Sequence, residues 1–173
     1  MSEEERIFLG LGSNLGNRYQ NLRSGIDMLN EHPHIWVMNK SHVYQSPPMY
    51  NLDQDQYYNM VIAIDTNLIP VELLNTIKTI EKKVGRKVKK KKNMPRVLDI
   101  DILAIGSLQI HSGILEIPHA GISERKFVLK PWNDIAPKFK VPGENALVSE
   151  ILENTEDNSD VRMVLIFDKE DMF

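Results

Sequence analysis

The sequence has no cysteine, which excludes disulfide bonds and thiolate chemistry and agrees with a reducing compartment. No apolar run approaches the roughly 20 residues that a transmembrane helix needs. The acidic start at residues 1–5 lacks the basic and apolar regions of a signal peptide. We therefore expect a cytoplasmic protein with no membrane partner. Aromatic residues are only 7% of the chain and the net charge is −3, so we expect no nucleic-acid partner.

What is present is the composition of an ordinary globular protein, with 42% hydrophobic and 26% charged residues in a chain of 173. This length predicts a single domain, residues 1–173, that is large enough to bury a core. A polar stretch at 153–160 follows the last predicted helix. We therefore expect residues 153–173 to form a peripheral C-terminal extension, and we expect the protein to be a monomer.

Basic residues gather in one short segment of this acidic chain, at Lys82, Lys83, Arg86, Lys87, Lys89, Lys90, Lys91, Lys92 and Arg96. Such a cluster attracts an anion to one place, although some of these lysines are expected only to face solvent. Residues 85–94 show no hydrophobic periodicity and lie between a predicted helix and a predicted strand. We predict that this segment is a mobile loop that closes over an anion as a lid.

Residues 95–103 predict a strand in which acidic and aliphatic side chains alternate. Asp99 and Asp101 would share one face of this strand, whereas Leu98, Ile100 and Ile102 would be buried on the other. Two carboxylates held this close need a cation, or one of them takes up a proton. Oxygen ligands suit magnesium. Two solvated aspartates are the simpler explanation of such a pattern, but the preceding basic residues favour a nucleotide site.

The predicted elements follow the order β-α-β-β-α-β. The strands are residues 6–11, 35–44, 57–66 and 95–103, and the helices are one that Asn17 caps and one from Pro70 to Val84. This order is typical of a ferredoxin-like, mixed antiparallel sheet with both helices on one face. Helices at 123–129 and 146–152 would cover the other face, and 162–167 would add an edge strand. The predicted class is α+β, a three-layer α-β-α sandwich.

The first strand is followed by Gly-Ser-Asn-Leu-Gly-Asn at residues 12–17. These residue types tolerate unusual backbone angles and favour a tight turn. The segment has neither the glycine spacing of a dinucleotide-binding loop nor the Gly-Lys-Ser/Thr of a phosphate loop. We therefore predict a turn that borders a ligand, without a claim on phosphate.

Several short motifs stand in the order found in one known family. They are Gly12-Ser13-Asn14-Leu15-Gly16, Tyr44-Gln45-Ser46-Pro47-Pro48, Gln56-Tyr57-Tyr58-Asn59, Glu81 with Gly85-Arg86, Pro95-Arg96-Val97-Leu98-Asp99-Ile100-Asp101-Ile102 and Ile117-Pro118-His119. Over nearly its whole length the chain resembles the 6-hydroxymethyl-7,8-dihydropterin pyrophosphokinases of folate biosynthesis. The resemblance implies transfer of diphosphate from ATP to the hydroxymethyl group of the reduced pterin. The pterin hydroxyl would attack the β-phosphorus and release AMP.

The resemblance also implies how ATP is bound. Asp99 and Asp101 would hold two Mg²⁺ ions that bridge the phosphates, and Arg86 and Arg96 would grip phosphate oxygens with their planar guanidinium groups. These four are the implied catalytic residues. The implied ATP-binding residues are Glu81, Arg86, Arg96, Ile102, His119 and Arg125.

The same resemblance implies a pterin site. Tyr57 and Phe127 would stack on the ring, and Asn59 would pair with its amide-like edge because it offers both a donor and an acceptor. Ser46 and Met49 would contact the rest of the ring through backbone groups, held rigid by Pro47 and Pro48. Without the resemblance, Glu81 would be placed on an exposed helix face, His119 would be a structural histidine, and Phe127 would belong to the core.

The chain departs from the family pattern in the predicted lid. Asn93 and Met94 replace the usual tryptophan and glycine, Val88 replaces a second arginine, and Ala120 follows His119 where an aromatic residue is common. These changes predict a weaker lid. Two alternatives stay open: a catalytically weakened homologue that binds nucleotide, and a ferredoxin-like module that binds nucleic acid with its sheet and lysine loop.

Overall fold

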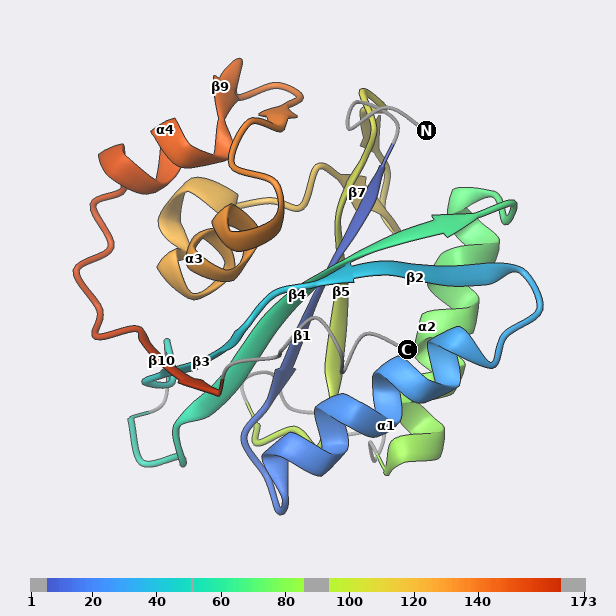
Figure 1. Ribbon diagram of the computed structural model, residues 1–173, viewed down its shortest axis with the longest axis horizontal. Helices are drawn as coiled ribbons and strands as arrows, with labels where there is room; N and C mark the ends of the chain where they lie inside the picture. The colour runs from blue at the N-terminus through green and yellow to red at the C-terminus, as the bar shows by residue number, and fades with distance from the viewer. Residues whose placement is uncertain (1–5, 51, 86–93, 166–173) are drawn as a thin grey trace.

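A twisted antiparallel sheet crosses the molecule, and helices pack against its two faces (Figure 1). The computed structural model describes residues 6–50, 52–85 and 94–165. In this part of the chain the sheet has six strands in the order β10-β3-β4-β1-β5, and β2 pairs with the remaining length of β4. The strands are β1 (Ile7–Ser13), β2 (Ile35–Lys40), β3 (Val43–Ser46), β4 (Tyr57–Thr66), β5 (Asp99–Ile105) and β10 (Arg162–Leu165). Within the described residues these strands pair antiparallel with their neighbours.

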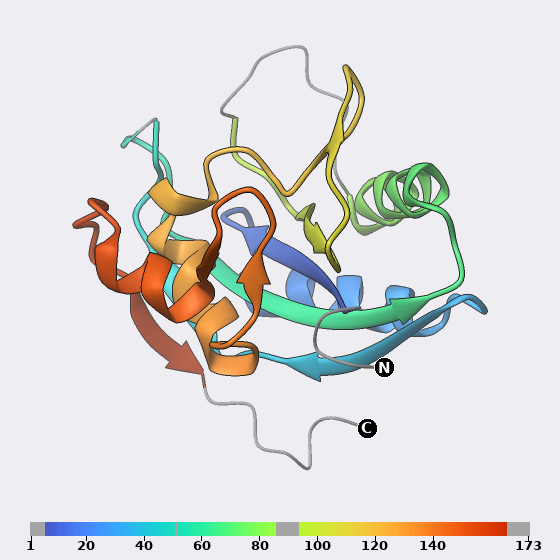
Figure 2. The same ribbon diagram turned by 90° about the horizontal axis from the view of Figure 1, so that it is seen from above.

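The helices form a layer on each side of this sheet. The first layer contains α1 (Arg18–Asn30) and α2 (Pro70–Val84), and the second contains α3 (Lys126–Ile135) and α4 (Val148–Asn154). Figures 1 and 2 show the two pairs on opposite sides. A 3-10 turn, η2 (Ile122–Glu124), precedes α3, and the small hairpins are β6 (Ile110–His111) with β7 (Glu116–Ile117), and β8 (Lys140–Val141) with β9 (Ala146–Leu147). This confirms the predicted α+β three-layer sandwich with a ferredoxin-like strand order.

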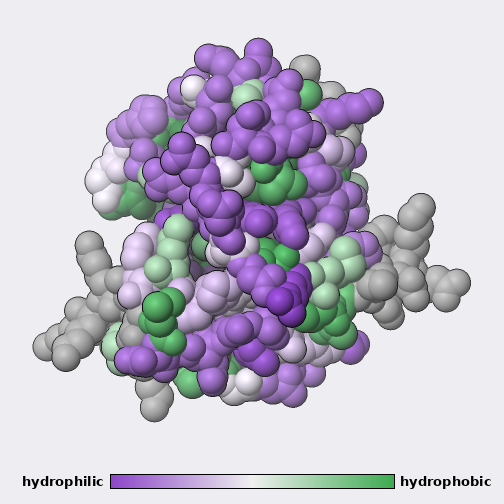
Figure 3. Space-filling view, turned by 90° about the vertical axis from the view of Figure 1, so that its left-hand side faces the viewer, coloured by the Kyte–Doolittle hydropathy of each residue, from purple (hydrophilic) through white to green (hydrophobic). Residues whose placement is uncertain are grey.

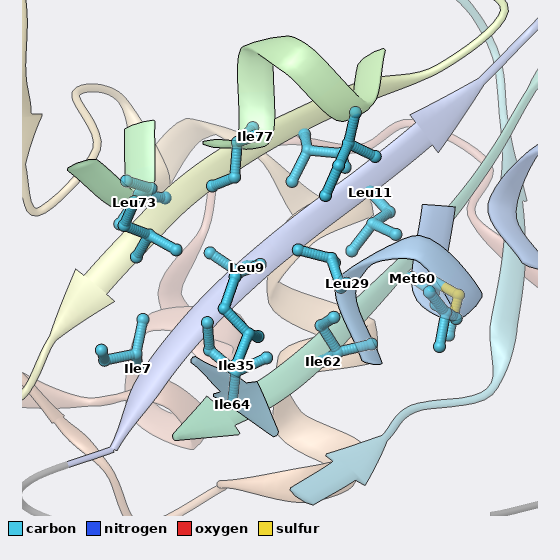
Figure 4. Close-up of a cluster of buried hydrophobic side chains, with 14 of the residues drawn as sticks. Ile7, Leu9, Leu11, Leu29, Ile35, Met60, Ile62, Ile64, Leu73 and Ile77 are labelled. Atoms are coloured by element: carbon cyan, nitrogen blue, oxygen red, sulfur yellow. The ribbon is translucent and has the colours of Figure 1, made fainter. Parts of the chain in front are cut away.

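The alternation of side chains along β4 explains why both faces are covered. Met60, Ile62 and Ile64 enter the core under α1 and α2, while Val61 and Ala63 enter the core under α3 and α4. In the first core, leucine and isoleucine side chains from the sheet meet those of both helices (Figure 4). Full burial of one such side chain contributes about 1.5–3 kcal/mol. The strand is therefore central, as its unbroken apolar run predicts.

The second core is built around aromatic rings. Phe8 of β1 lies 5.3 Å from Trp132 of α3 and 4.8 Å from Phe139, between ring centroids. Trp132 and Phe139 also pack on each other at 5.6 Å. All three side chains are buried. This cluster holds the second half of α3 against the sheet.

The predicted strand at 35–44 is broken in the structure into β2 and β3. Ser41 pairs with Val61 through its backbone N–H at 2.9 Å, but its hydroxyl oxygen also accepts from the Val61 N–H at 2.9 Å. A serine side chain thus replaces a backbone carbonyl in the ladder, which is how short polar side chains compete with regular structure. The chain bends at this point and β3 continues along the other half of β4.

The predicted helix ends agree with the structure at several positions. Asn17 caps α1 by accepting from the Gln20 N–H at 3.0 Å, Pro70 begins α2, and Gly85 ends it with a φ of 120°. The later helices differ. α3 runs to Ile135 in spite of the internal Pro131, and α4 begins after the short strand β9. None of the helices in the described ranges is long and apolar enough to cross a membrane.

Candidate active site

A cleft of about 360 Å³ opens on the α3 side of the sheet. It is bordered by β1, β4 and β5, by the chain that follows β3, and by the first turn of α3. Eleven of the predicted site residues line it: Ser46, Pro47, Met49, Tyr57, Asn59, Arg96, Asp99, Asp101, His119, Arg125 and Phe127. The structure therefore brings together residues that are up to 81 positions apart in the sequence. The residues predicted to bind ATP phosphates and those predicted to bind the pterin thus line the same cleft.

The two aspartates share a face of β5, as the alternation predicts. Ile100 between them is buried in the opposite core. The Asp99 carboxylate pairs with the Arg96 guanidinium at 2.5 Å between Oδ1 and Nη1, and Asp101 lies 3.8 Å from Nε2 of His119. Burial, followed by the nearby Asp99 carboxylate, raises the pKa of Asp101. The pair is thus a place where added positive charge is favoured.

His119 presents one ring nitrogen to Asp101 because the other is engaged. Its Nδ1 donates to the carbonyl of Ala120 at 2.6 Å, since a carbonyl can only accept. Its backbone N–H donates to the Leu103 carbonyl at 2.9 Å, which ties the loop to β5. The ring is thus fixed with Nε2 toward the Asp101 carboxylate.

A polar pair lies in the other part of the cleft. The Asn59 side-chain amide donates to the Ser46 hydroxyl at 2.8 Å, and both residues are buried. This bond orients the Asn59 amide with respect to β3. Tyr57 lies half-buried at the start of β4, where burial raises the pKa of its hydroxyl. The neutral phenol and its ring are thus available as an uncharged surface of the cleft.

Two glycines of β1 form part of the cleft lining. Gly12 begins the turn that was predicted to border a ligand, whereas Gly10 was not predicted to line a site. A Cβ atom added at Gly12 would lie 3.2 Å from Oδ1 of Asn59, and one added at Gly10 would lie 3.3 Å from Leu103. Glycine inside a strand often marks a close approach of another group. The alternation of glycine with leucine in the first strand was the signal that could have revealed them.

Asn14 lies in the same turn and has a structural role that was not predicted from the sequence. It is 1% exposed and joins three segments. Its side chain donates to Gln54 at 3.0 Å and to the Asp55 carbonyl at 3.3 Å, and it accepts from the Arg96 N–H at 2.8 Å. The predicted strand from residue 95 begins only at Asp99, because the Arg96 backbone pairs with Asn14 instead of with a strand. The turn at 12–17 thus holds the site together.

Two predicted ATP-binding residues, Glu81 and Ile102, do not join the cleft lining. Glu81 is 1% exposed, so its placement on an exposed helix face was wrong; its carboxylate accepts from the Ile100 N–H at 2.8 Å and pairs with Lys78. The Ile102 side chain is buried in the core under α1 and α2. Arg86, with the predicted lid residues Val88 and Asn93, lies outside the described residues. The ATP-binding roles of Glu81, Ile102 and Arg86 stay predictions.

Comparison with known proteins identifies the family of this chain. A sequence model of the 7,8-dihydro-6-hydroxymethylpterin-pyrophosphokinase family matches residues 8–137. The chain belongs to this pyrophosphokinase family. The family predicted from the sequence is thereby confirmed, and the RNA-binding alternative is not favoured.

Curated relatives of the family agree with this membership. A 2-amino-4-hydroxy-6-hydroxymethyldihydropteridine pyrophosphokinase of Methylorubrum extorquens is 41% identical over 139 residues, which are 80% of this chain and 87% of that protein. One of Pseudomonas aeruginosa is 36% identical, over 80% and 85%. The folic acid synthesis protein FOL1 of Dictyostelium discoideum is 42% identical over 79% of this chain, but the chain spans only 20% of that longer protein.

Solved structures support the fold. The chain superposes on a Plasmodium falciparum HPPK-DHPS crystal structure with a TM-score of 0.71 at 16% identity, over 93% of this chain and 49% of that one. A second HPPK-DHPS structure from the same organism gives a TM-score of 0.68 over 86% of the chain. At this identity the likeness concerns the arrangement of the backbone, which agrees with the family assignment.

Proposed function

We propose that the chain transfers diphosphate from ATP to 6-hydroxymethyl-7,8-dihydropterin and releases AMP, as a step of folate synthesis. The observation that carries this proposal is the sharing of one cleft by two sets of residues. Asp99, Asp101 and Arg96 offer groups that bind metal and phosphate, while Tyr57 and Asn59 offer a ring face and an amide. Family membership supports the same reaction.

The polyphosphate would lie over β5 and the first turn of α3. Arg96 already holds one carboxylate, and its planar fork leaves further N–H groups for phosphate oxygens. Arg125 and His119 line the same part of the cleft. Most of the barrier to phosphoryl transfer is lowered by positioning and charge compensation, so fixed cationic side chains are the expected equipment.

The carboxylate pair fits magnesium. No cluster of three or more acidic, histidine or cysteine side chains in the described residues could hold a metal ion by itself. Magnesium is typically bound by one or two carboxylates together with waters and substrate phosphates, which matches Asp99 and Asp101 beside a polyphosphate. Bound there, magnesium would neutralise charge on the phosphates. We propose that Asp99 and Asp101 together would hold two Mg²⁺ ions.

The pterin would occupy the part of the cleft that β1 keeps open. Gly12 leaves room beside Asn59, whose amide is oriented by Ser46. Tyr57 and Phe127 supply aromatic faces for stacking. With the hydroxymethyl group directed to the phosphates, its oxygen would form a bond to the β-phosphorus. The bond from that phosphorus to the bridging oxygen of the α-phosphate would break, AMP would leave, and the hydroxyl proton would pass to water.

The experiment mixes the protein with ATP, Mg²⁺ and 6-hydroxymethyl-7,8-dihydropterin and follows AMP. We expect AMP to form only when both substrates are present. Asp99→Asn and Asp101→Asn should abolish turnover, whereas Asp65→Asn, at the far end of β4, should not. ATP binding without AMP formation would favour the nucleotide-binding homologue instead. The cytoplasmic location and the monomeric state expected from the sequence stay predictions.

A further inference from the structure

Residues 155–161 connect α4 to β10 and pass along α3 (Figure 1). We call this segment the strap. It follows the part of the chain that the family model matches, which ends at residue 137. The surface on this side of the molecule is mostly hydrophilic (Figure 3), and the contacts of the strap with η2 and α3 are largely polar. These contacts converge on the first turn of α3, which carries Arg125 and Phe127.

This first turn needs support from outside the helix. Arg125 joins η2 to α3 with a φ of −125° and a ψ of 79°, and its side chain makes no capping hydrogen bond. The first N–H groups of a helix have no partner within it and require an external acceptor. An uncapped first turn frays readily, and any fraying would displace Arg125 and Phe127 at the cleft.

The strap supplies that acceptor and a second anchor. Oδ2 of Asp157 accepts from the Lys126 N–H at 2.8 Å, at the beginning of α3. The Thr155 hydroxyl donates to the Ser123 carbonyl at 2.7 Å, within η2. The backbone is therefore held by the strap two residues before Arg125 and one residue after it.

The strap is itself fastened, so it can act as a fixed support. The Lys126 ammonium donates to the Ser159 carbonyl at 3.2 Å, and the Lys130 ammonium donates to the Val161 carbonyl at 2.8 Å. Val161 is 3% exposed. Oδ1 of Asp157 accepts from the Ser159 N–H at 2.9 Å, which fixes the orientation of the capping carboxylate.

We propose that Asp157 is a positioning residue, which acts through the first turn of α3 to hold Arg125 and Phe127 at the cleft. The inference rests on the proposed function, because Arg125 and Phe127 contact substrate only if the cleft binds ATP and the pterin. Asp157 touches no substrate in this arrangement. It provides a fixed helix end, and the cleft residues on that end are ordered before ligand arrives.

The main test compares Asp157→Ala with Asp160→Ala. Asp160 is a matched control because it lies on the same strap, is exposed and pairs with Arg162. We expect Asp157→Ala to raise the pterin KM about three- to tenfold, the range that loss of a helix cap can produce. Asp157→Asn keeps one acceptor and should recover part of the loss. Asp160→Ala should stay within about twofold of wild type.

A double-mutant cycle separates positioning from general destabilisation. If Asp157 acts through Phe127, Asp157→Ala should change the pterin KM by less than about twofold in a Phe127→Ala background. If the increases in pterin KM of the two single variants multiply in the double variant, the proposal is overturned. A wild-type pterin KM in Asp157→Ala would overturn it as well.

A measurement that does not depend on turnover tests the role of Asp157 separately from the proposed function. Trypsin cleaves after Arg125 and Lys126, so cleavage there, mapped by mass spectrometry, reports on opening of the first turn. We expect Asp157→Ala to be cut about three- to tenfold faster at these positions than Asp160→Ala. If the wild type forms no AMP, the proposed function fails but this measurement still stands. Equal cleavage rates would overturn the role of Asp157.

Discussion

Asn14 and Arg96 exchange two hydrogen bonds although 82 residues separate them in the sequence. The Asn14 N–H donates to the Arg96 carbonyl at 3.0 Å, and the Arg96 N–H donates to the Asn14 side-chain oxygen at 2.8 Å. The turn after β1 thereby holds the segment that leads into β5. Arg96 and Asp99, which would face the same phosphates in the proposed reaction, are thus placed by an amide that does not line the cleft.

Asn14→Ala should therefore reduce both stability and turnover. The change leaves the partly buried Arg96 N–H without its acceptor, and an unpaired buried group costs about 1–3 kcal/mol. Asn14→Asp keeps this acceptor but loses the donor to Gln54 and Asp55. We expect the alanine variant to lose more stability than the aspartate variant in urea unfolding. Equal losses would mean that the bond to Arg96 contributes little.

Much of the fold follows from side-chain alternation that is visible in the sequence. The run from Met60 to Ile64 predicts a strand that is buried on both faces, and the spacing of Asp99 and Asp101 predicts their common face. What could not be predicted depends on contacts between distant segments. The hydroxyl of Ser41 accepts from the Val61 N–H across the sheet, and the buried Glu81 carboxylate accepts from the Ile100 N–H.

The candidate site was predicted largely through the family resemblance, and the structure adds residues that make no polar contact of their own. Gly12 is the clearest case. A glycine has no side chain whose chemistry would indicate a site. The open space at Gly12 matters because the Asn59 side chain lies beside it. The sequence predicts only a polar linker around Asp157. Its partner, the N–H of Lys126, is 31 residues away in the sequence and is brought close by folding.

Gly12→Ala should weaken pterin binding. The added Cβ would lie 3.2 Å from Oδ1 of Asn59, so the Asn59 amide must shift by a few tenths of an ångström. We expect the pterin KM to rise about tenfold, which corresponds to about 1.4 kcal/mol, with little change in the KM for ATP. Gly113→Ala is the matched control because its Cβ would meet nothing within 4 Å. A normal pterin KM in Gly12→Ala would remove Gly12 from the pterin site.

Arg96→Lys should lower turnover while the protein stays folded. Lysine keeps the positive charge but lacks the planar fork that can hold Asp99 and a phosphate oxygen together. We expect kcat to fall at least about tenfold, since a charged hydrogen bond contributes about 1.5–3 kcal/mol. Steady-state assays that vary ATP and pterin separately would measure this. Full activity in the lysine variant would exclude Arg96 from the site.

Magnesium should stabilise the protein through the two aspartates of β5. Burial and the Asp99 charge make the ionised Asp101 unfavourable, so removal of one carboxylate should relieve repulsion in the metal-free protein. We expect Asp101→Asn to melt at the same temperature as wild type or higher without metal. With saturating Mg²⁺ and a non-hydrolysable ATP analogue, only the wild type should gain stability. Equal gains in both proteins would contradict the assignment of Asp101 as a ligand.

Asp157 predicts a pH dependence of stability. Its burial acts to raise the pKa of the carboxyl, but hydrogen bonds from Ser159 and Lys126, with the Lys126 charge, outweigh it and leave the pKa lowered. The folded chain therefore binds this proton less tightly than the unfolded chain. The carboxylate contributes stability above the unfolded pKa of about 3.9 and loses it as the pH falls through the folded pKa. Asp157→Asn should thus be less stable than wild type at pH 7 by up to about 1 kcal/mol, with a smaller difference in acid. Urea unfolding at both pH values, followed by tryptophan fluorescence, measures the two differences, and a difference that grows in acid would contradict the prediction.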